Sequence, residues 1–227
     1  MSARRLRINK PDAKSFVKIA VPAAINNTFF DFSNFFMQAA VNTLGDAVIA
    51  GCTAASSIGN LSYKVPAGFY SACVSFSGQN YGAQKFKRID KVLLWSIGMS
   101  IVGVLLCAGV LTMFPEQMLA IFNSDPEVIQ GGMAKMLVLS WGYTAYCFQG
   151  CISGCLHGLK RNTATTVINM IFVVGTRLPW ALLVFPLNRS ALVLFLCYPL
   201  SWLLCGIVQG VFFLRVRKKL WVKEAVE

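Results

Sequence analysis

Two stretches, Val92–Phe114 and Leu192–Leu214, run for more than twenty residues without a charged side chain. A helix needs about 20 mostly apolar residues to cross a bilayer, because each residue advances about 1.5 Å through a hydrocarbon core about 30 Å thick. Four other mostly apolar stretches have a similar length: Phe16–Val41, Val48–Phe76, Met133–Leu156 and Val167–Leu187. The sequence therefore predicts an all-α fold, an integral membrane bundle of six transmembrane helices.

The composition supports a membrane protein. Hydrophobic residues make up 56% of the 227 residues and charged residues only 13%, whereas a soluble domain carries about 25% charged residues. The formal net charge of +12 raises the possibility of a nucleic-acid partner. Because the basic residues lie in short connections and tails, we expect no nucleic-acid binding, and the anionic inner surface of a bilayer as their partner.

The basic residues also predict an orientation. Most of the 21 Lys and Arg lie in segments on one side of the six spans, at 4–18, 85–91, 160–161 and 215–223. Positive residues mark the cytoplasmic side. We therefore predict a cytoplasmic basic segment at 1–15, a six-helix lobe at 16–214 and a cytoplasmic basic tail at 215–227, in the cell (plasma) membrane.

Neither a metal site nor an enzyme is expected. The eight cysteines fall within apolar spans and form no C-x-x-C pair, and His157 is the only histidine. Cysteine at such positions packs as a small apolar residue, and zinc lacks its ligand pattern. Ser153 and His157 are four residues apart, but Cys151 replaces the glycine that an intramembrane serine protease would have. No cofactor is expected beyond a coupling ion, H+ or Na+.

Three charged residues lie deep in the predicted spans: Asp31, Lys64 and Arg177. At about 1.5 Å per residue, each is roughly 18–22 Å from the cytoplasmic end of its span. Charges at this depth are costly and mark functional sites, and transporters place substrate and ion sites near the midplane. Asp31 is therefore the candidate for binding a coupling cation. A structural ion pair between Asp31 and Arg177 is the alternative, and Lys64 can instead extend towards the interface.

The helix that carries Asp31 is unusually polar. Asn27, Asn34 and Gln38 recur at helical spacing with Asp31, which predicts a polar stripe along a cavity. The predicted cavity residues are Asn27, Asn34, Gln38, Lys64 and Arg177. In the fourth span, Gly150, Gly154 and Gly158 repeat every four residues, a pattern that lets another helix approach closely.

The segment Gly78-Gln79-Asn80-Tyr81-Gly82-Ala83-Gln84-Lys85 joins the second and third spans. A short, polar, basic connection at this place predicts a cytoplasmic hairpin loop, with Gly78, Gln79, Asn80 and Gly82 as its motif residues. On the opposite side, Asn123–Glu127 predicts a turn into an N-capped helix.

Four stretches together resemble the C-terminal half of a multidrug and toxic compound extrusion (MATE) family transporter. They are Ile19–Ala24, Ala50–Ile58, Ser77–Ala83, and Gly154–Thr163 with Arg177-Leu178-Pro179 in the next span. The resemblance implies an antiporter that expels organic, often cationic, compounds in exchange for H+ or Na+. It also implies twelve helices in two lobes, so that the N-terminal lobe of the same transporter, or a second half, is the expected partner.

The resemblance bears on the coupling site. Members often have an acidic residue in the seventh helix, which corresponds to the first span here, so it implies a cation-coupling role for Asp31. Some members have a further acid in the tenth helix, whereas the corresponding fourth span has only Gln149 and Tyr143 as polar candidates.

Two other functions stay open. One is a six-span half-transporter or flippase that acts as a homodimer on anionic or lipid substrates. Lys64 and Arg177 outnumber Asp31 within the spans, which favours an anionic substrate or a lipid headgroup over a cation. The other is a membrane scaffold that transports nothing.

Overall fold

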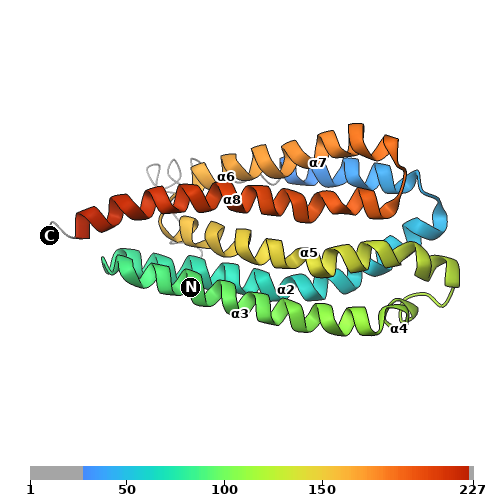
Figure 1. The fold of residues 1–227 in the computed structure, drawn as a ribbon, viewed down its shortest axis with the longest axis horizontal. Helices are drawn as coiled ribbons and strands as arrows, with labels where there is room; N and C mark the ends of the chain where they lie inside the picture. The colour runs from blue at the N-terminus through green and yellow to red at the C-terminus, as the bar shows by residue number, and fades with distance from the viewer. Residues whose placement is uncertain (1–27, 225–227) are drawn as a thin grey trace, which may run out of the picture.

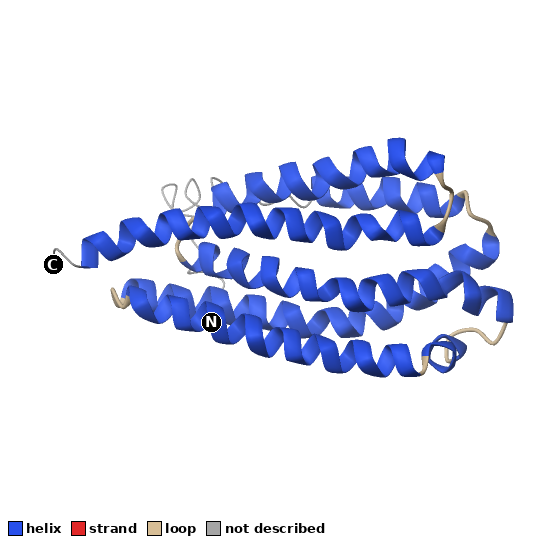
Figure 2. Cartoon of the chain, in the orientation of Figure 1, coloured by secondary structure: helices blue, strands red, loops and turns tan. Residues whose placement is uncertain are grey.

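The computed structural model describes residues 28–224, and every regular element among them is helical (Figure 2). The all-α prediction is confirmed. Residues 28–42 form the described part of the first helix. The remaining elements are α2 (Asp46–Gly82), α3 (Phe86–Met113), α4 (Pro115–Ala120), α5 (Pro126–Gly158), α6 (Asn162–Asn169), η2 (Met170–Val174), α7 (Gly175–Pro179), η3 (Trp180–Val184), η4 (Phe185–Leu187) and α8 (Ala191–Glu224).

The long helices run lengthwise beside one another, and α5 lies centrally among them (Figure 1). Helix α5 packs on α2, α3 and α8, which bury many of its residues along its whole length. By contrast, α3 leaves Leu94, Trp95 and Leu106 exposed by 68% or more. Exposed apolar side chains on the outside of a bundle are typical of a surface that contacts lipid. Helices suit that environment because their backbone polar groups form hydrogen bonds within each helix.

Helices α2 and α5 approach closely because glycines line their contact. A Cβ added at Gly154 would lie 2.6 Å from the carbonyl oxygen of Tyr70 and 2.8 Å from the Cβ of Cys73. At Gly158 it would lie 2.8 Å from the backbone nitrogen of Gly78. Gly150 differs, since a Cβ there would meet only the Tyr146 ring at 3.5 Å. The predicted close helix contact is therefore confirmed for Gly154 and Gly158.

Three stretches of the described chain are long and apolar enough to cross a membrane: Phe86–Met113, Asn162–Leu187 and Ala191–Leu220. Helix α2, with 37 residues, and α5, with 33, are long enough but carry more small and polar residues. Six spans therefore stay a prediction. Helix α8 continues to Glu224 without a break at 214, so the predicted basic tail begins as part of this helix.

The predicted hairpin loop is shorter than expected. Gly78, Gln79 and Asn80 lie in the last turns of α2, and Gly82 is its last residue. Only residues 83–85 connect α2 to α3, with Gln84 in the left-handed region at φ 57°. Placing the whole motif in a loop was wrong because one left-handed residue reverses the chain, which lets α2 continue to pack on α5 through Gly78.

The predicted turn on the opposite side is confirmed. Asp125 caps α5, since its side chain accepts a hydrogen bond of 2.9 Å from the backbone N–H of Glu127. The Asn123 side chain accepts from the backbone N–H of Asp125, also at 2.9 Å. Side-chain acceptors at these positions satisfy N–H groups that have no partner within the helix.

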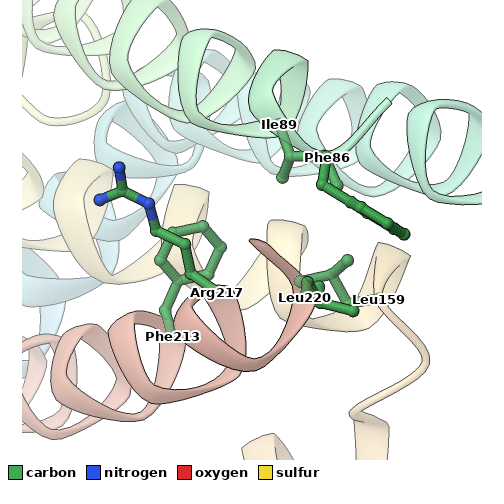
Figure 3. A pocket seen from close by; sticks show the side chains of 6 residues that line it. All are labelled: Phe86, Ile89, Leu159, Phe213, Arg217 and Leu220. Carbon is green, nitrogen blue, oxygen red and sulfur yellow. The ribbon is translucent and has the colours of Figure 1, made fainter. Parts of the chain in front are cut away.

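Helices α3 and α8 pack closely where α3 begins. Figure 3 shows the residues that surround a small gap there: Phe86, Ile89, Leu159, Phe213, Arg217 and Leu220. The gap measures about 10 Å³, about enough for one water molecule. An ion pair of 3.1 Å between Arg217 Nε and Asp90 Oδ1 also joins the two helices. The contact between α3 and α8 is therefore packed, and this gap offers no room for a ligand larger than water.

Candidate functional site

A cavity of about 640 Å³ opens among the first helix, α2, α5, the 162–187 stretch and α8. This volume falls within the range of sites for small organic molecules, about 300–1,000 Å³. Aromatic side chains form much of its wall: Phe30, Tyr63, Tyr70, Tyr143, Tyr146, Tyr198 and Trp202. Among the described residues that line it, the charged side chain is Arg177 and none is acidic.

The stretch that carries Arg177 is irregular. Helix α7 lies between two π-helical turns, η2 and η3, so that residues 162–187 form one helical stretch with two widened turns. Pro179 is part of α7, and it lacks the N–H that would bond the carbonyl four residues earlier. Widened turns of this kind often occur at functional sites. Arg177 lies between these two turns, and only 1% of it is exposed.

The Arg177 guanidinium has neutral partners. Nε donates to Ser201 Oγ and Nη1 donates to Asn34 Oδ1, both at 3.3 Å, while Nη2 is buried without a hydrogen-bond partner among the described residues. Arginine stays charged in proteins and carries five N–H donors. The predicted alternative, an ion pair with Asp31, is not formed, since Asn34 holds the position that a carboxylate would take.

Three rings surround the same guanidinium. Its Cζ lies 4.1 Å from the ring centroid of Tyr198, 5.1 Å from that of Phe30 and 5.7 Å from that of Trp202. Cation–π contacts of this kind contribute roughly 0.5–2 kcal/mol each. A desolvated charge costs several kcal/mol, and the three rings together offset at least part of that cost.

The far part of the cavity holds His157. The Tyr70 hydroxyl lies 2.8 Å from His157 Nδ1, and His157 Nε2 is buried without a partner among the described residues. The Nδ1 atom thus pairs with Tyr70 and leaves Ser153 without a hydrogen-bonded base. A serine nucleophile is activated by a base within hydrogen-bond reach, so this geometry does not support the serine-protease alternative.

Carboxamide side chains form another part of the wall. Asn169 Oδ1 accepts from Gln149 Nε2 at 3.0 Å and from Gln209 Nε2 at 2.9 Å. The Cys205 thiol donates to the same oxygen at 3.1 Å. This network joins α5, α6 and α8 inside the bundle, and it gives Gln149, which the sequence offered as the polar residue of the fourth span, an interhelical role.

The predicted cavity residues are divided. Asn34 and Arg177 line the cavity and contact each other. Asp31, Gln38 and Lys64 are exposed and do not line it, and Asn27 lies outside the described residues. Gln38 instead donates to Asn42 at 3.0 Å. Asn34 faces α7, whereas Asp31 and Gln38 lie on the exposed part of the helix, so these three side chains do not line this cavity together.

Sequence reasoning missed the aromatic wall and the carboxamide network. The aromatic residues do repeat at helical spacing, as Tyr63 with Tyr70, Tyr143 with Tyr146, and Tyr198 with Trp202. Rings with polar tips on one face of a predicted span were a usable signal. Asn169 and Gln209 lie in separate spans, and nothing in the sequence links them.

Comparison with known proteins defines the class of protein to which this chain belongs. The family model described as MatE matches residues 22–183. The chain belongs to the MATE family of multidrug transporters, as the resemblance indicated.

Curated relatives agree with this assignment. The chain is 26% identical over 165 residues to a FAD transporter of Shewanella oneidensis, covering 73% of the chain and 36% of the relative. It is 24% identical over 181 residues to the probable multidrug resistance protein YoeA of Bacillus subtilis, covering 78% and 38%. The chain thus spans little more than a third of these relatives.

Solved structures show the same fold. A MATE protein crystallised with MaL6 superposes with a TM-score of 0.79 at 15% identity, over 97% of this chain and 50% of the other. A MOP superfamily transporter from Pyrococcus furiosus gives a TM-score of 0.79 at 16% identity, with the same coverage. The chain therefore has the fold of about half of each of these structures, which fits the predicted single lobe.

Proposed function

We propose that this chain forms the C-terminal lobe of a MATE exporter, which expels small organic compounds together with an N-terminal lobe. The observation that carries the proposal is the cavity of about 640 Å³, whose wall combines aromatic rings, carboxamides and one buried cation. Such a wall suits organic molecules that have both ring faces and polar groups. Half-length coverage of the solved relatives supports the need for a second lobe.

Export would be driven by antiport of H+ or Na+, with Asp31 as the cation-binding group. Asp31 is exposed on the first helix, next to Phe30 and one turn before Asn34, both of which line the cavity. A carboxylate at this place is accessible to an ion and adjacent to the substrate space. Binding of a cation there can thus be linked to movement of the helix that contacts Arg177.

The orientation rests on charge. A second hollow, of about 400 Å³, lies between the start of α6 and the last turns of α8, and its basic lining residues are Arg161, Arg215, Lys218 and Lys219. Positive residues at one end of the bundle support the proposal that this end and both termini face the cytoplasm, with the transporter in the plasma membrane.

The relatives leave the substrate class open. One is named a probable multidrug resistance protein and another a FAD transporter. The cationic substrates that the family resemblance implies have no acidic partner among the described residues that line the cavity. The cavity therefore favours uncharged or anionic aromatic compounds over cations.

Transport in vesicles tests this proposal. A transporter that joins this chain to an N-terminal MATE lobe is reconstituted, and flux of ethidium and of carboxyfluorescein is measured under imposed proton or sodium gradients. We expect gradient-driven flux that Asp31→Asn abolishes and Asp46→Asn, at an exposed carboxylate at the start of α2, leaves intact.

Each other outcome has a definite meaning. Unchanged ion dependence in Asp31→Asn would show that this carboxylate does not couple transport. Equal flux by the chain without the N-terminal lobe would favour the homodimeric half-transporter. If neither dye is transported by a monodisperse and folded preparation, export is contradicted.

A further inference from the structure

We propose that Arg177 is the anchor of a binding site for aromatic oxyanions, in which a carboxylate, sulfonate or phosphate group binds the guanidinium and the attached ring system packs on the cavity wall. The substrate class of the exporter would then be aromatic acids. This assignment builds on the proposed function for its transport role, whereas binding itself does not depend on it.

The buried positive charge of Arg177 has no negative partner among the described side chains. Arg177 is 1% exposed and permanently charged, and the structure gives it no carboxylate partner among residues 28–220, whose side chains it describes. Buried charges in proteins are normally paired. The partner is therefore expected to come from outside the described chain, and a ligand in the adjoining cavity is in position to supply it.

The guanidinium donors of Arg177 also have weak partners or none. The bonds to Ser201 and Asn34, at 3.3 Å, are longer than the 2.7–2.9 Å typical of a charge-assisted bond between arginine and an oxyanion. Nη2 has no partner among the described residues. A bidentate oxyanion can bind Nη2 together with either Nε or Nη1 through two short parallel bonds, which is the geometry that planar arginine recognises best.

Aromatic rings of the cavity wall lie next to this charge. Tyr143 and Trp202 are stacked, with centroids 5.6 Å apart and planes at 26°, and both line the cavity. Tyr198 and Trp202 also contact Arg177, so the anion position and the ring faces adjoin. A ligand with a flat apolar body and one charged end matches this combination.

His157 offers a second hydrogen-bond donor in the same cavity. His157 Nε2 is buried, without a partner among the described residues, and His157 lines the same cavity. When the Tyr70 hydroxyl donates to Nδ1, the proton of the neutral imidazole is on Nε2, which can then donate to a polar group of the ligand. A cationic ligand finds no carboxylate at either position.

Three probes that share one ring system test the charge preference: 2-naphthoate, 2-naphthylmethylammonium and the neutral 2-naphthalenemethanol. Binding to the purified full chain in a neutral detergent is measured by isothermal titration calorimetry. We expect 2-naphthoate to bind at least about tenfold more tightly than either of the others, the difference expected for one charge-assisted hydrogen-bonded pair. Equal or tighter binding of the ammonium compound would overturn the proposal without any variant.

Variants then locate the site. Arg177→Gln should weaken naphthoate binding by at least about tenfold, and Arg177→Lys should recover only part of it, because lysine keeps the charge but loses the planar fork. Lys135→Gln is the control: Lys135 is a partly buried cation that donates to Ser56 and does not line the cavity, so its loss should leave binding unchanged. A loss in Lys135→Gln equal to that in Arg177→Gln would contradict a local site.

Failure of this inference is distinguishable from failure of the proposed function. Flux without a preference for naphthoate would leave the exporter standing and remove the aromatic acid as its substrate class. Naphthoate binding that depends on Arg177, in a reconstituted transporter without flux, would keep the site and remove export.

Discussion

The two sides of α5 are built on different principles. Towards α2, the contact is made by glycines and cysteines, and a single added Cβ at Gly154 or Gly158 would overlap the facing backbone. Towards the first helix, the 162–187 stretch and part of α8, large aromatic side chains and an arginine surround a cavity of about 640 Å³. One helix thus has a close-packed side and a hollow side.

This difference shows which side of α5 is suited to stay rigid and which side is suited to change its conformation. Backbones in contact through glycines have little freedom to slide without overlap. The hollow side has two widened helical turns, a buried charge without an anion, and hydrogen bonds between polar side chains. Interactions of the second kind have alternative arrangements, which a transporter needs if its cavity is to open and close.

The largest expected effect breaks the close-packed side. Gly154→Ala places a methyl group 2.6 Å from the Tyr70 carbonyl oxygen, so we expect a loss of about 3 kcal/mol in the free energy of unfolding. Thermal unfolding in detergent measures it. The control is Gly150→Ala, one turn earlier, where the methyl meets only the Tyr146 ring at 3.5 Å. Equal behaviour of the two variants would contradict the glycine contact as the source of rigidity.

The second effect has the opposite sign and lies on the hollow side. Arg177→Met removes a buried charge that has no anion among the described residues, so in the absence of ligand we expect the chain to gain about 1–2 kcal/mol. The same thermal measurement applies, with Arg189→Met, at an exposed arginine, as the control with little effect. A clear loss of stability in Arg177→Met would mean that its neutral partners and rings compensate its burial fully.

The smallest effect concerns the outside of the lobe. Lys64 is exposed, so Lys64→Gln should change the free energy of unfolding of this chain by no more than about 0.5 kcal/mol. Unfolding in the presence of an N-terminal lobe then sharpens the comparison. A destabilisation that appears only with that lobe would place Lys64 at the contact between lobes, whereas a loss in the isolated chain would contradict its exposure.

Two residues of the candidate site, Arg177 and Asn34, were within reach of sequence reasoning, and the limits are physical. A charge within an apolar run is visible without a structure, which is how Arg177 was found, and Asn34 followed from helical spacing with Asp31. The same spacing argument failed for Gln38. It places residues on a common face of one helix, but it does not say how that helix is rotated relative to its neighbours.

The sequence by itself determined the helical class, the family and the half-length match, because apolar run lengths, turn residues and short motifs are local properties. The tertiary structure alone decided which charges share an environment. Arg177 meets Asn34 across 143 positions of chain, while Asp31, three residues from Asn34, stays exposed. Those rotations depend on contacts between helices that are far apart in the chain, and no single segment of the chain contains that information.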